Sequence, residues 1–310
     1  MKNFGLIGAA GYIAPRHMKA IKDTHNNLVA CYDTNDSVGI IDSYFPNARF
    51  FTEFERYDRH IEKLKYENDL LIEYTSICSP NYLHDAHIRF ALRSGSNAIC
   101  EKPLVLNPWN IDKLSKAEEN TGKRIFTVLQ LREHESIIEL KNRYKKFDKK
   151  IKINLTYITS RGNWYYNSWK GDNSKSGGIA SNIGVHFFDM LTWIFGKVDQ
   201  NIVHMNNEKT SAGFLSLENA EVSWFLSIDS NTLPKFISEK GQRTYRSIKI
   251  DNEELEFSEG FTELHTKVYN SILNENGYGI YDTYQAIDIV HNIRNSKLSK
   301  KGIFHPFLVK

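Results

Sequence analysis

The stretch Phe4-Gly5-Leu6-Ile7-Gly8-Ala9-Ala10-Gly11-Tyr12-Ile13-Ala14 decides the fold of this chain. It begins as an apolar strand and continues as a loop of small residues, behind which a helical pattern starts. Gly8 allows a tight turn, Gly11 lets the backbone approach a ligand, and Ala14 is small enough for the helix to pack on the sheet. The loop is not a regular G-x-G-x-x-G, because Gly8 and Gly11 are one residue further apart than the usual first pair. This order of elements predicts the first unit of a parallel sheet.

The first 130 residues repeat this alternation of short apolar runs and helical patterns, which is typical of a doubly wound sheet. Strands are expected at 4–7, 28–32, 49–51, 71–77, 97–100 and 124–129. Helices are expected between them at 15–24, 37–44, 54–65, 83–94 and 108–121. The fold class is therefore α/β, with an N-terminal Rossmann domain over residues 1–130.

From residue 152 onward the pattern changes to an alternation of period two, which indicates antiparallel strands. A lysine-rich helix at 136–150 precedes it and is expected to be a solvated connection. Strands are expected at 153–160, 201–205, 212–217, 221–227, 235–239 and 246–250, and helices at 183–195, 262–275 and 281–296. We predict a C-terminal α+β domain over 131–310, with a large open, mainly antiparallel sheet and helices on one face.

Length and composition are those of a soluble protein with two domains. The chain has 310 residues, of which 41% are hydrophobic and 25% are charged. This length is too great for one ordinary hydrophobic core. No apolar run reaches the ~18 residues of a membrane helix, and the first strand leaves no room for a signal peptide. The net charge of +3 is too small to indicate nucleic-acid binding. Cys31, Cys78 and Cys100 lack a C-x-x-C pair, so we expect reduced core residues of a cytoplasmic protein and no metal site.

Asp33 ends the second predicted strand, 22 residues after Gly11. A carboxylate at this place binds both hydroxyls of an adenosine ribose and repels a 2′-phosphate, which predicts NAD as the cofactor in preference to NADP. A turn-forming or capping role for Asp33 is the alternative. The loop residues expected to bind the dinucleotide are Gly8, Ala10, Gly11, Tyr12 and Ile13.

Polar residues follow the carboxyl ends of the later strands, where a doubly wound sheet binds its ligand. Ser79 and Asn81 come after the fourth strand and His84 stands in the helical turn behind them, although Asn81 is equally suited to cap that helix. Gln130 follows the sixth strand and is assigned to the cofactor as well.

Glu101-Lys102-Pro103 follows the fifth strand, and we expect the nicotinamide near Asn81, Glu101 and Lys102. A lysine behind a buried strand is poorly placed for simple solvation. Partial burial lowers the pKa of such an amine, which then hydrogen-bonds or deprotonates a substrate hydroxyl. The structural alternative is an ion pair between Lys102 and Glu101.

A second group of polar residues follows the glycine pair Gly177-Gly178. Asn182 and His186 are four residues apart, so they share one face of a helix, with Asp189 one turn further on. Asp189 is suited to hold the imidazole in one tautomer while its other nitrogen meets a substrate. A purely structural histidine is the alternative.

The motifs together resemble the Gfo/Idh/MocA family of NAD(P)-dependent sugar and inositol oxidoreductases. The resemblance covers the whole chain and is carried by the loop at 8–14 leading to His17, by Ser79-Pro80-Asn81 with His84, by Glu101-Lys102-Pro103, and by Gly178 with His186 and Asp189. It implies a Rossmann domain followed by an open-sheet domain that carries the substrate and often the oligomer interface. It also implies Lys102 and His186 as catalytic residues.

The motifs Tyr44-Phe45-Pro46, Thr159-Ser160-Arg161-Gly162, Trp169-Lys170-Gly171 and Lys175-Ser176-Gly177-Gly178 resemble one group within that family, the bacterial UDP-N-acetylglucosaminuronate 3-dehydrogenases. This resemblance implies a UDP-sugar uronate as substrate, 2-oxoglutarate as a second partner that regenerates NAD, a role in surface polysaccharide (lipopolysaccharide) synthesis, and a homo-oligomer, either tetramer or dimer. Many family members carry aspartate where this chain has Asn182. Because asparagine lacks that charge, the catalytic roles fall to Lys102 and His186.

The second half also supplies cations suited to an anionic sugar nucleotide, because arginine binds carboxylate and phosphate bidentately. A single cation of this kind is more often a solvated surface charge. The aromatic residues beside Arg161 are suited either to stack a sugar or uracil or to line a domain interface. The cations are Arg161, Lys170, Lys175, Arg243 and Arg246, and the aromatic residues are Trp164, Tyr165, Tyr166 and Trp169. The residues assigned to the substrate are Lys102, Arg161, Trp169, Lys170, Asn182 and His186.

These residues predict an NAD-dependent dehydrogenase acting on the C3′ hydroxyl of UDP-2-acetamido-2-deoxy-glucuronate. His186 is favoured as the base and Lys102 as the group that stabilises the alkoxide, with the exchanged assignment also open. The alternatives are a dehydrogenase of another sugar or of inositol, and a catalytically silent NAD-binding sensor.

Overall fold

The computed structural model describes residues 1–67, 70–144, 149–251, 253–255 and 263–309. The chain divides into two compact units, and each of them is built from two separate stretches of sequence. The first unit comprises Met1–Glu133 and Phe261–Thr283, and the second comprises His134–Gly260 and Tyr284–Lys310.

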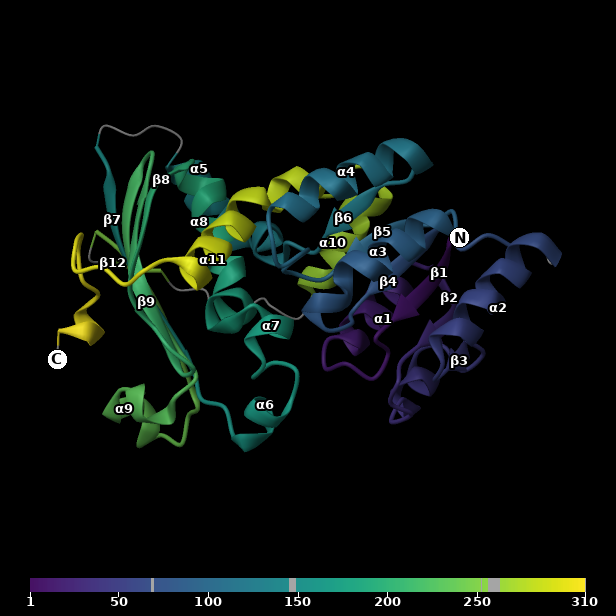
Figure 1. Ribbon diagram of the computed structural model, residues 1–310, viewed down its shortest axis with the longest axis horizontal. Helices are drawn as coiled ribbons and strands as arrows, with labels where there is room; N and C mark the ends of the chain where they lie inside the picture. The colour runs from purple at the N-terminus through teal and green to yellow at the C-terminus, as the bar shows by residue number, and fades with distance from the viewer. Residues whose placement is uncertain (68–69, 145–148, 252, 256–262, 310) are drawn as a thin grey trace. The chain divides into compact units, whose positions relative to one another are not determined.

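The first unit contains a six-stranded sheet with the order β3-β2-β1-β4-β5-β6, in which all neighbours are parallel. Its strands are β1 (Asn3–Ile7), β2 (Asn27–Tyr32), β3 (Arg49–Phe51), β4 (Tyr74–Ile77), β5 (Asn97–Cys100) and β6 (Ile125–Thr127). The strand order reverses between β1 and β4, and such a reversal opens a ligand crevice at the carboxyl ends of the strands. The predicted doubly wound sheet is confirmed (Figure 1).

Helices cover both faces of this sheet. They are α1 (Ala14–Asp23), α2 (Phe54–Glu67), α3 (His84–Arg93), α4 (Trp109–Thr121) and α10 (Leu264–Leu273). One apolar core joins Phe4 and Met18 to Val268 of α10, and another joins Ile7 to Tyr57 of α2. Phe4 and Ile7 lie an odd number of positions apart on one strand and so point to opposite faces of the sheet. The predicted helix at 37–44 is a 3₁₀ segment, Gly39–Ser43.

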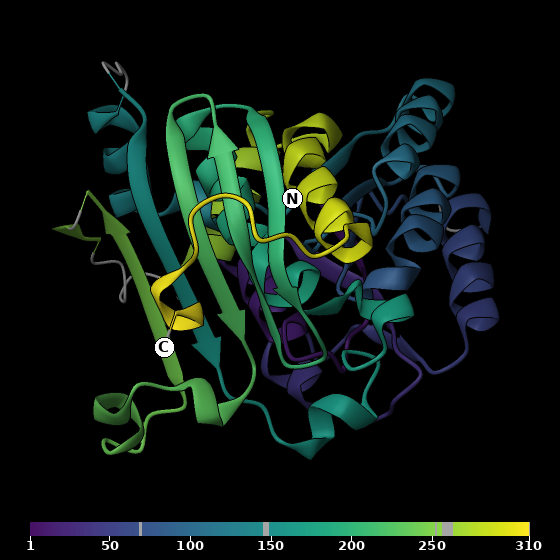
Figure 2. The same ribbon diagram turned by 60° about the vertical axis from the view of Figure 1, so that its left-hand side comes forward.

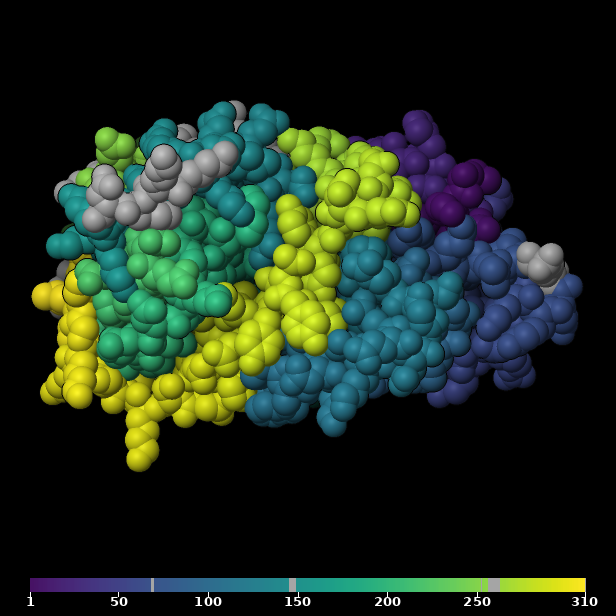
Figure 3. All heavy atoms as spheres, turned by 90° about the horizontal axis from the view of Figure 1, so that it is seen from above, coloured from purple at the N-terminus to yellow at the C-terminus, as the bar shows by residue number. Residues whose placement is uncertain are grey.

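Helix α10 comes late in the sequence and nevertheless belongs to the first unit. The single boundary expected at residue 130 assigns this helix to the C-terminal domain. In the structure Val268 and Tyr269 are fully buried, and the rings of Tyr269 and Phe4 lie 5.9 Å apart. The surface of α10, yellow-green in Figure 3, adjoins that of the blue helices of the same unit.

The second unit contains a six-stranded sheet with the order β12-β11-β7-β10-β9-β8. Its strands are β7 (Ile151–Thr159), β8 (Val198–Asn206), β9 (Thr210–Leu217), β10 (Ala220–Ser227), β11 (Thr244–Ile250) and β12 (Glu253–Glu254). Its pairs are antiparallel except for the central pair of β7 and β10, which is parallel. The predicted open sheet is therefore mixed, and alternation alone does not reveal the direction of a neighbouring strand (Figure 2).

The two faces of the second sheet are covered differently. Its helices are α5 (Glu135–Arg143), α6 (Asn163–Asn167), α7 (Asn173–Ser176), α8 (Val185–Phe195), α9 (Lys235–Ser238) and α11 (Tyr284–Asn295). Trp224 of β10 packs edge-on against Phe188 of α8, with ring centroids 5.4 Å apart. The next residue, Phe225, stacks on His305 at 5.6 Å. Because adjacent strand residues point to opposite faces, the chain after α11 covers the face that α8 does not (Figure 2).

Two expectations for the second half need correction. The strand expected at 235–239 is wrong, because the segment forms helix α9, in which the carbonyl of Pro234 accepts hydrogen bonds from the amides of Ile237 and Ser238. The lysine-rich helix expected at 136–150 ends at Arg143, and residues 145–148 lie outside the described residues.

Two further expectations concern the cysteines and the membrane. Cys31, Cys78 and Cys100 are buried and free, as predicted. Among the residues described above, no helix has the length and apolar character needed to cross a membrane.

Candidate active site

The glycine loop after β1 is held closely against the ends of β2 and β4. Gly8 has a φ of +93°, a conformation that glycine adopts freely, and its amide donates to the carbonyl of Tyr32 at 2.8 Å. A Cβ at Gly8 would lie 2.6 Å from the backbone of Cys78 and Ser79. The tight turn predicted here therefore requires a glycine at position 8, both because of its φ angle and because the neighbouring backbone leaves no space for a Cβ.

The loop leads into the start of α1 without a polar capping side chain. Ile13 stands at the N-cap position and Pro15 lies in the first turn, so no side-chain oxygen satisfies the first amides of the helix. Tyr12 is 88% exposed and Gly11 is half-buried. The backbone amides at this helix start are suited to bind an anion such as a pyrophosphate.

Asp33 lies beside this loop, directly after β2. One carboxylate oxygen accepts the amide of Ala10 at 2.9 Å and the other accepts the amide of Asn35 at 2.9 Å. These bonds fix the orientation of the carboxylate at the edge of the glycine loop. A turn-forming role and a ribose-binding role for Asp33 are compatible, since each oxygen has a second lone pair.

The residues after β4 are linked to those after β5 by His84. Its Nδ1 lies 2.8 Å from the carbonyl oxygen of Pro103, and its Nε2 lies 2.9 Å from that of Ser79. Burial lowers the pKa of His84, and the two carbonyls oppose this change. The Ser79 hydroxyl pairs with His87 at 2.8 Å, and Asn81 is buried at the start of a 3₁₀ turn. His84 thus ties together the two strand ends that the sequence assigned to the cofactor.

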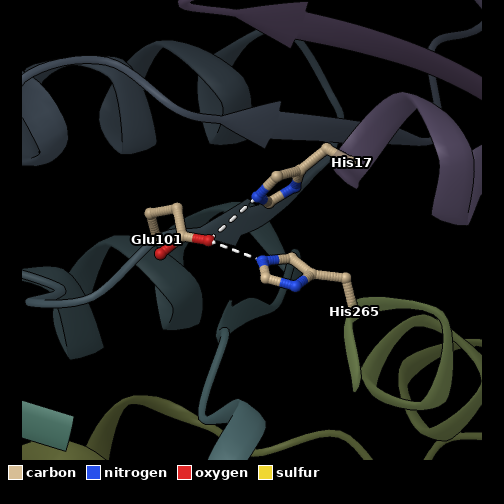
Figure 4. A group of neighbouring side chains, drawn as sticks. All are labelled: His17, Glu101 and His265. Carbon is tan, nitrogen blue, oxygen red and sulfur yellow. Dashed lines mark hydrogen bonds and ion pairs between the residues drawn. The ribbon is translucent and has the colours of Figure 1, made fainter. Parts of the chain in front are cut away.

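Glu101 lies at the centre of a buried cluster with two histidines, shown in Figure 4. Its Oε1 is 3.0 Å from Nε2 of His17 on α1 and 3.0 Å from Nε2 of His265 on α10. Its Oε2 accepts the backbone amide of Lys102 at 3.2 Å. Burial opposes ionisation of Glu101, but the hydrogen bonds from His17 and His265 outweigh it and hold the pKa well below its usual range.

Lys102 directly follows Glu101 in the sequence and is half-buried. Its removal from water lowers the pKa of its amine, and the negative charge of Glu101 opposes that shift. At the end of β6, Gln130 has a buried side-chain oxygen with no hydrogen-bond partner among the described residues. An orphaned acceptor, an uncapped helix start and a fixed carboxylate together fit a bound dinucleotide.

In the second unit the segment with Asn182 and His186 differs from the single helix predicted for it. Residues Ala180–Gly184 form a π-helical turn, and α8 begins only at Val185. A Cβ at Gly184 would lie 2.5 Å from a methyl group of Leu226, so this glycine allows the wide turn to pack on the sheet. Such turns are frequent at functional sites.

The structure brings Asn182 together with the loop that precedes it. Its amide nitrogen donates to the hydroxyl of Tyr165 at 3.1 Å and to the carbonyl of Lys170 at 3.3 Å. The ammonium of Lys170 lies 4.2 Å from the centre of the Trp169 ring. Three residues that the sequence assigned to the substrate, Trp169, Lys170 and Asn182, are therefore neighbours.

His186 lies in the first turn of α8 with aromatic rings around it. Its ring is 4.3 Å from that of Phe187 and meets the Tyr157 ring edge-on at 6.3 Å. The guanidinium of Arg246 lies 5.4 Å from the same Tyr157 ring. Asp189, which was expected to orient His186, is buried on α8. An imidazole, a tyrosine and an arginine therefore lie next to one another in the second unit.

The other predicted cations differ in their surroundings. Arg161 and Arg243 are exposed, and Ser160 between β7 and Arg161 donates its amide to the carbonyl of Arg243 at 2.8 Å, which brings the two segments together. Lys175 forms an ion pair with Asp172 at 3.6 Å on α7. Lys102 belongs to the first unit, whereas His186 and the remaining cations belong to the second.

Sequence reasoning missed the roles of His17, His265 and Tyr157. His17 and His265 occupy buried helix positions, and each meets Glu101 across 84 or 164 residues of sequence. Nothing in the spacing signals such a contact. Tyr157 lies on strand β7, and its neighbours His186 and Arg246 come from other elements. The sequence of β7 alone therefore does not show this contact.

Family models match both halves of the chain. Residues 2–129 match the model described as "Oxidoreductase family, NAD-binding Rossmann fold", and residues 149–231 match "Oxidoreductase family, C-terminal alpha/beta domain". Among curated relatives, glucose-6-phosphate 3-dehydrogenase of Bacillus subtilis is 25% identical over 219 residues, covering 63% of this chain and 54% of the relative. The chain therefore spans about half the length of the curated relatives it matches.

Solved structures match the whole chain. The WlbA (WbpB) dehydrogenase from Thermus thermophilus, crystallised with NAD and α-ketoglutarate, is 49% identical, with a TM-score of 0.95 over 99% of this chain and 100% of that one. The same enzyme with NAD and UDP-GlcNAcA is 48% identical at the same TM-score and coverage. The WlbA dehydrogenase from Bordetella pertussis shares the fold, at 20% identity and a TM-score of 0.76 over 94% of each chain. The chain therefore belongs to the Gfo/Idh/MocA oxidoreductase family, with an NAD-binding Rossmann domain as its first part.

Proposed function

We propose that this protein oxidises the C3′ hydroxyl of UDP-2-acetamido-2-deoxy-glucuronate to a ketone with NAD. The observation that carries the proposal is the likeness along the whole chain, at 48% identity, to a dehydrogenase crystallised with NAD and UDP-GlcNAcA. The lysine behind β5, the fixed carboxylate of Asp33 and the histidine at the start of α8 support the same chemistry.

An alcohol releases its hydride only as its hydroxyl proton is removed, and a positioned base contributes about 10²–10⁴ in rate. NAD, when bound, supplies the hydride acceptor. We assign the base to His186 and the stabilisation of the developing alkoxide to Lys102, whose ammonium hydrogen-bonds the oxygen. An exchange of the two roles is the alternative within this mechanism, because burial lowers the pKa of Lys102 toward that of a usable base.

For NAD we propose binding along the carboxyl ends of the first sheet. The pyrophosphate lies on the amides at the start of α1, and the adenosine ribose meets Asp33. The nicotinamide end lies near Lys102 and the orphaned oxygen of Gln130. The residues proposed to bind the cofactor are Gly8, Ala10, Gly11, Tyr12, Ile13, Asp33, Ser79, Asn81, His84, Glu101, Lys102 and Gln130. For Glu101 and His84 the contribution is indirect, since their polar atoms already meet protein groups.

For the substrate we propose recognition by cations and stacking. Arg161 and Lys170 provide charge for the uronate or the diphosphate, and Trp169 provides an aromatic face. Asn182 holds the Lys170 segment in place through the carbonyl it binds. The residues proposed to bind the substrate are Lys102, Arg161, Trp169, Lys170, Asn182 and His186.

The WlbA complex with α-ketoglutarate supports a second proposal, that 2-oxoglutarate re-oxidises the reduced cofactor while it stays bound. The protein as purified is then expected to carry an absorbance band of reduced nicotinamide that bleaches when 2-oxoglutarate is added. A band that persists in excess 2-oxoglutarate would speak against recycling and leave the dehydrogenase assignment intact.

We further propose a cytoplasmic homo-oligomer, tetramer or dimer, that acts in surface polysaccharide (lipopolysaccharide) synthesis. Three buried free cysteines support a reducing compartment, and the nucleotide-sugar chemistry supports the pathway class. Light scattering during gel filtration measures the oligomer directly, and a single species at 35.9 kDa would contradict it.

The decisive test compares hydride transfer to NAD from UDP-GlcNAcA, glucose 6-phosphate and myo-inositol under identical conditions. The nucleotide sugar is expected to give the highest kcat/KM by at least tenfold. A preference for glucose 6-phosphate would favour the second candidate activity, that of the Bacillus subtilis relative. Absence of turnover with all three, together with intact NAD binding, would favour a sensor.

A further inference from the structure

The buried cluster of His17, Glu101 and His265 joins three elements that are far apart in sequence. His17 comes from α1, Glu101 from the end of β5 and His265 from α10, and they are 0%, 6% and 1% exposed. Figure 4 shows both imidazoles directed at the same carboxylate oxygen. Burying a carboxylate is strongly unfavourable unless its lone pairs are satisfied, and here both oxygens of Glu101 accept hydrogen bonds.

The direction of each hydrogen bond follows from the chemistry of the partners. A carboxylate only accepts, so His17 and His265 both donate from Nε2. Burial lowers the pKa of His17, so its ring is neutral and Nδ1 must accept from the Tyr269 hydroxyl, 2.7 Å away. The Tyr269 oxygen in turn accepts from the Ser76 hydroxyl at 2.6 Å. Protons therefore point along one path from Ser76 to Glu101, and the carboxylate keeps its full negative charge.

Two imidazoles and a carboxylate also form a set that binds zinc in other proteins. Zinc ligands aim at an ion about 2.0–2.2 Å away and not at one another. Here both Nε2 atoms aim at one oxygen at 3.0 Å, and the second oxygen accepts the Lys102 amide. The geometry is that of a hydrogen-bonded cluster.

We propose that His17, Glu101 and His265 are positioning residues that hold a fixed negative charge next to Lys102, so that its amine stays protonated and can stabilise the developing alkoxide. This inference rests on the proposed function, because it gives Lys102 its role. In this role the two imidazoles act through Glu101 and do not contact the substrate themselves.

The electrostatic surroundings of Lys102 agree with this assignment. Burial lowers the pKa of its amine, and the charge of Glu101 counteracts that effect. Among the titratable neighbours of Glu101 are Cys100 on β5, Cys78 directly after β4 and Tyr269 on α10, and burial raises the pKa of all three well above their usual values. They stay uncharged at neutral pH. His84 faces Lys102 from α3, and burial lowers its pKa as well.

The test measures the protonation of Lys102 without relying on turnover. The full chain is treated with trace acetic anhydride at pH values from 6 to 11, and acetylation of the Lys102 peptide is followed by mass spectrometry. Glu101→Gln keeps the shape and removes the charge, so the midpoint for Lys102 is expected to fall by about one pH unit. Glu118→Gln is the matched control, since that carboxylate is half-buried on α4 and accepts the Ile125 amide. It is expected to leave the midpoint unchanged.

The histidines are tested by paired substitutions. His265→Leu removes one of the two imidazole donors that hold the Glu101 carboxylate in place. The charge remains but is less well fixed, so the Lys102 midpoint is expected to fall by less than in Glu101→Gln. His265→Gln restores an N–H donor and is expected to return the midpoint toward the wild-type value. A merely structural role for His265 would change the melting temperature in both variants and leave the Lys102 midpoint where it was.

Several outcomes separate the two levels of the argument. An unchanged midpoint in a folded Glu101→Gln variant overturns the inference, whatever happens to turnover, and if that variant does not fold the His265 pair decides in the same way. A shifted midpoint combined with full activity of Lys102→Ala retains the charge relation and overturns the catalytic role of Lys102. Stoichiometric zinc in the purified protein would replace the hydrogen-bonded cluster by a metal site and overturn the inference too.

Discussion

At the scale of single residues, Lys102 combines a half-buried side chain with a hydrogen-bonded backbone amide. That amide is bound to the carboxylate of the preceding residue. The position of the backbone is therefore fixed by a hydrogen bond, and the side chain extends from this fixed point. A residue fixed in this way suits a reaction in which an ammonium must reach a developing alkoxide without relocating the strand end.

Replacing Lys102 by alanine is expected to lower kcat by at least about 10²-fold while NAD still binds, because the loss falls on the transition state. Formation of NADH at 340 nm measures the first quantity and fluorescence titration the second. Lys175→Ala is the control, since this lysine pairs with Asp172 on α7. A Lys102→Ala enzyme with near wild-type kcat would remove the residue from the mechanism.

Asp33→Ser tests the choice of cofactor. The substitution removes a charged acceptor that is oriented by the amides of Ala10 and Asn35. NAD affinity is expected to fall by about tenfold or more, and NADP affinity to rise relative to it, because repulsion of the 2′-phosphate disappears. Dissociation constants for both dinucleotides give the ratio. Asp36→Ser, at an exposed position in the same loop, should leave that ratio unchanged.

At the scale of elements, the parallel sheet was the part most open to prediction. Most of its strands carry short apolar runs, which are typical of a sheet covered on both faces, and the loop at Gly8 follows the first of them. The π turn at Ala180–Gly184 was not predictable, because it depends on a glycine that meets Leu226 of a strand far along the chain. Helix α9 was missed since Pro234, which starts it, equally suits the end of a strand.

A substitution at Gly8 tests whether the loop after β1 depends on its glycine. Gly8→Ala puts a Cβ within 2.6 Å of the Cys78 and Ser79 backbone at a φ of +93°. The melting temperature is expected to fall by several degrees, corresponding to about 1–3 kcal/mol, and NAD binding to weaken at least tenfold because the loop moves. Gly39→Ala is the matched control, since a Cβ there meets nothing within 4 Å. Equal melting temperatures for the two variants would contradict the strained-turn account.

At the scale of the whole molecule, the sequence indicated two units and the structure adds how the chain is divided between them. The parallel sheet and the open sheet were each visible in a local period. The return of α10 to the first unit was not, because an amphipathic helix fits either core equally well. The same return brings His265 to Glu101, so the unexpected placement of this helix and the missed cluster have one cause.

The division predicts how fragments fold. A fragment of residues 1–133 lacks α10 and leaves the core around Phe4 and Met18 exposed, since Val268, Tyr269 and Ile272 complete it. We expect this fragment to bind a hydrophobic dye and to melt without a cooperative transition. Joining it through a flexible linker to residues 263–283 restores the missing core and, with it, a cooperative transition and NAD binding. Near-ultraviolet circular dichroism and heat capacity report the difference. A cooperative, NAD-binding 1–133 fragment would show that α10 contributes little, and the linkage of His17 and His265 through Glu101 would then lose its structural purpose.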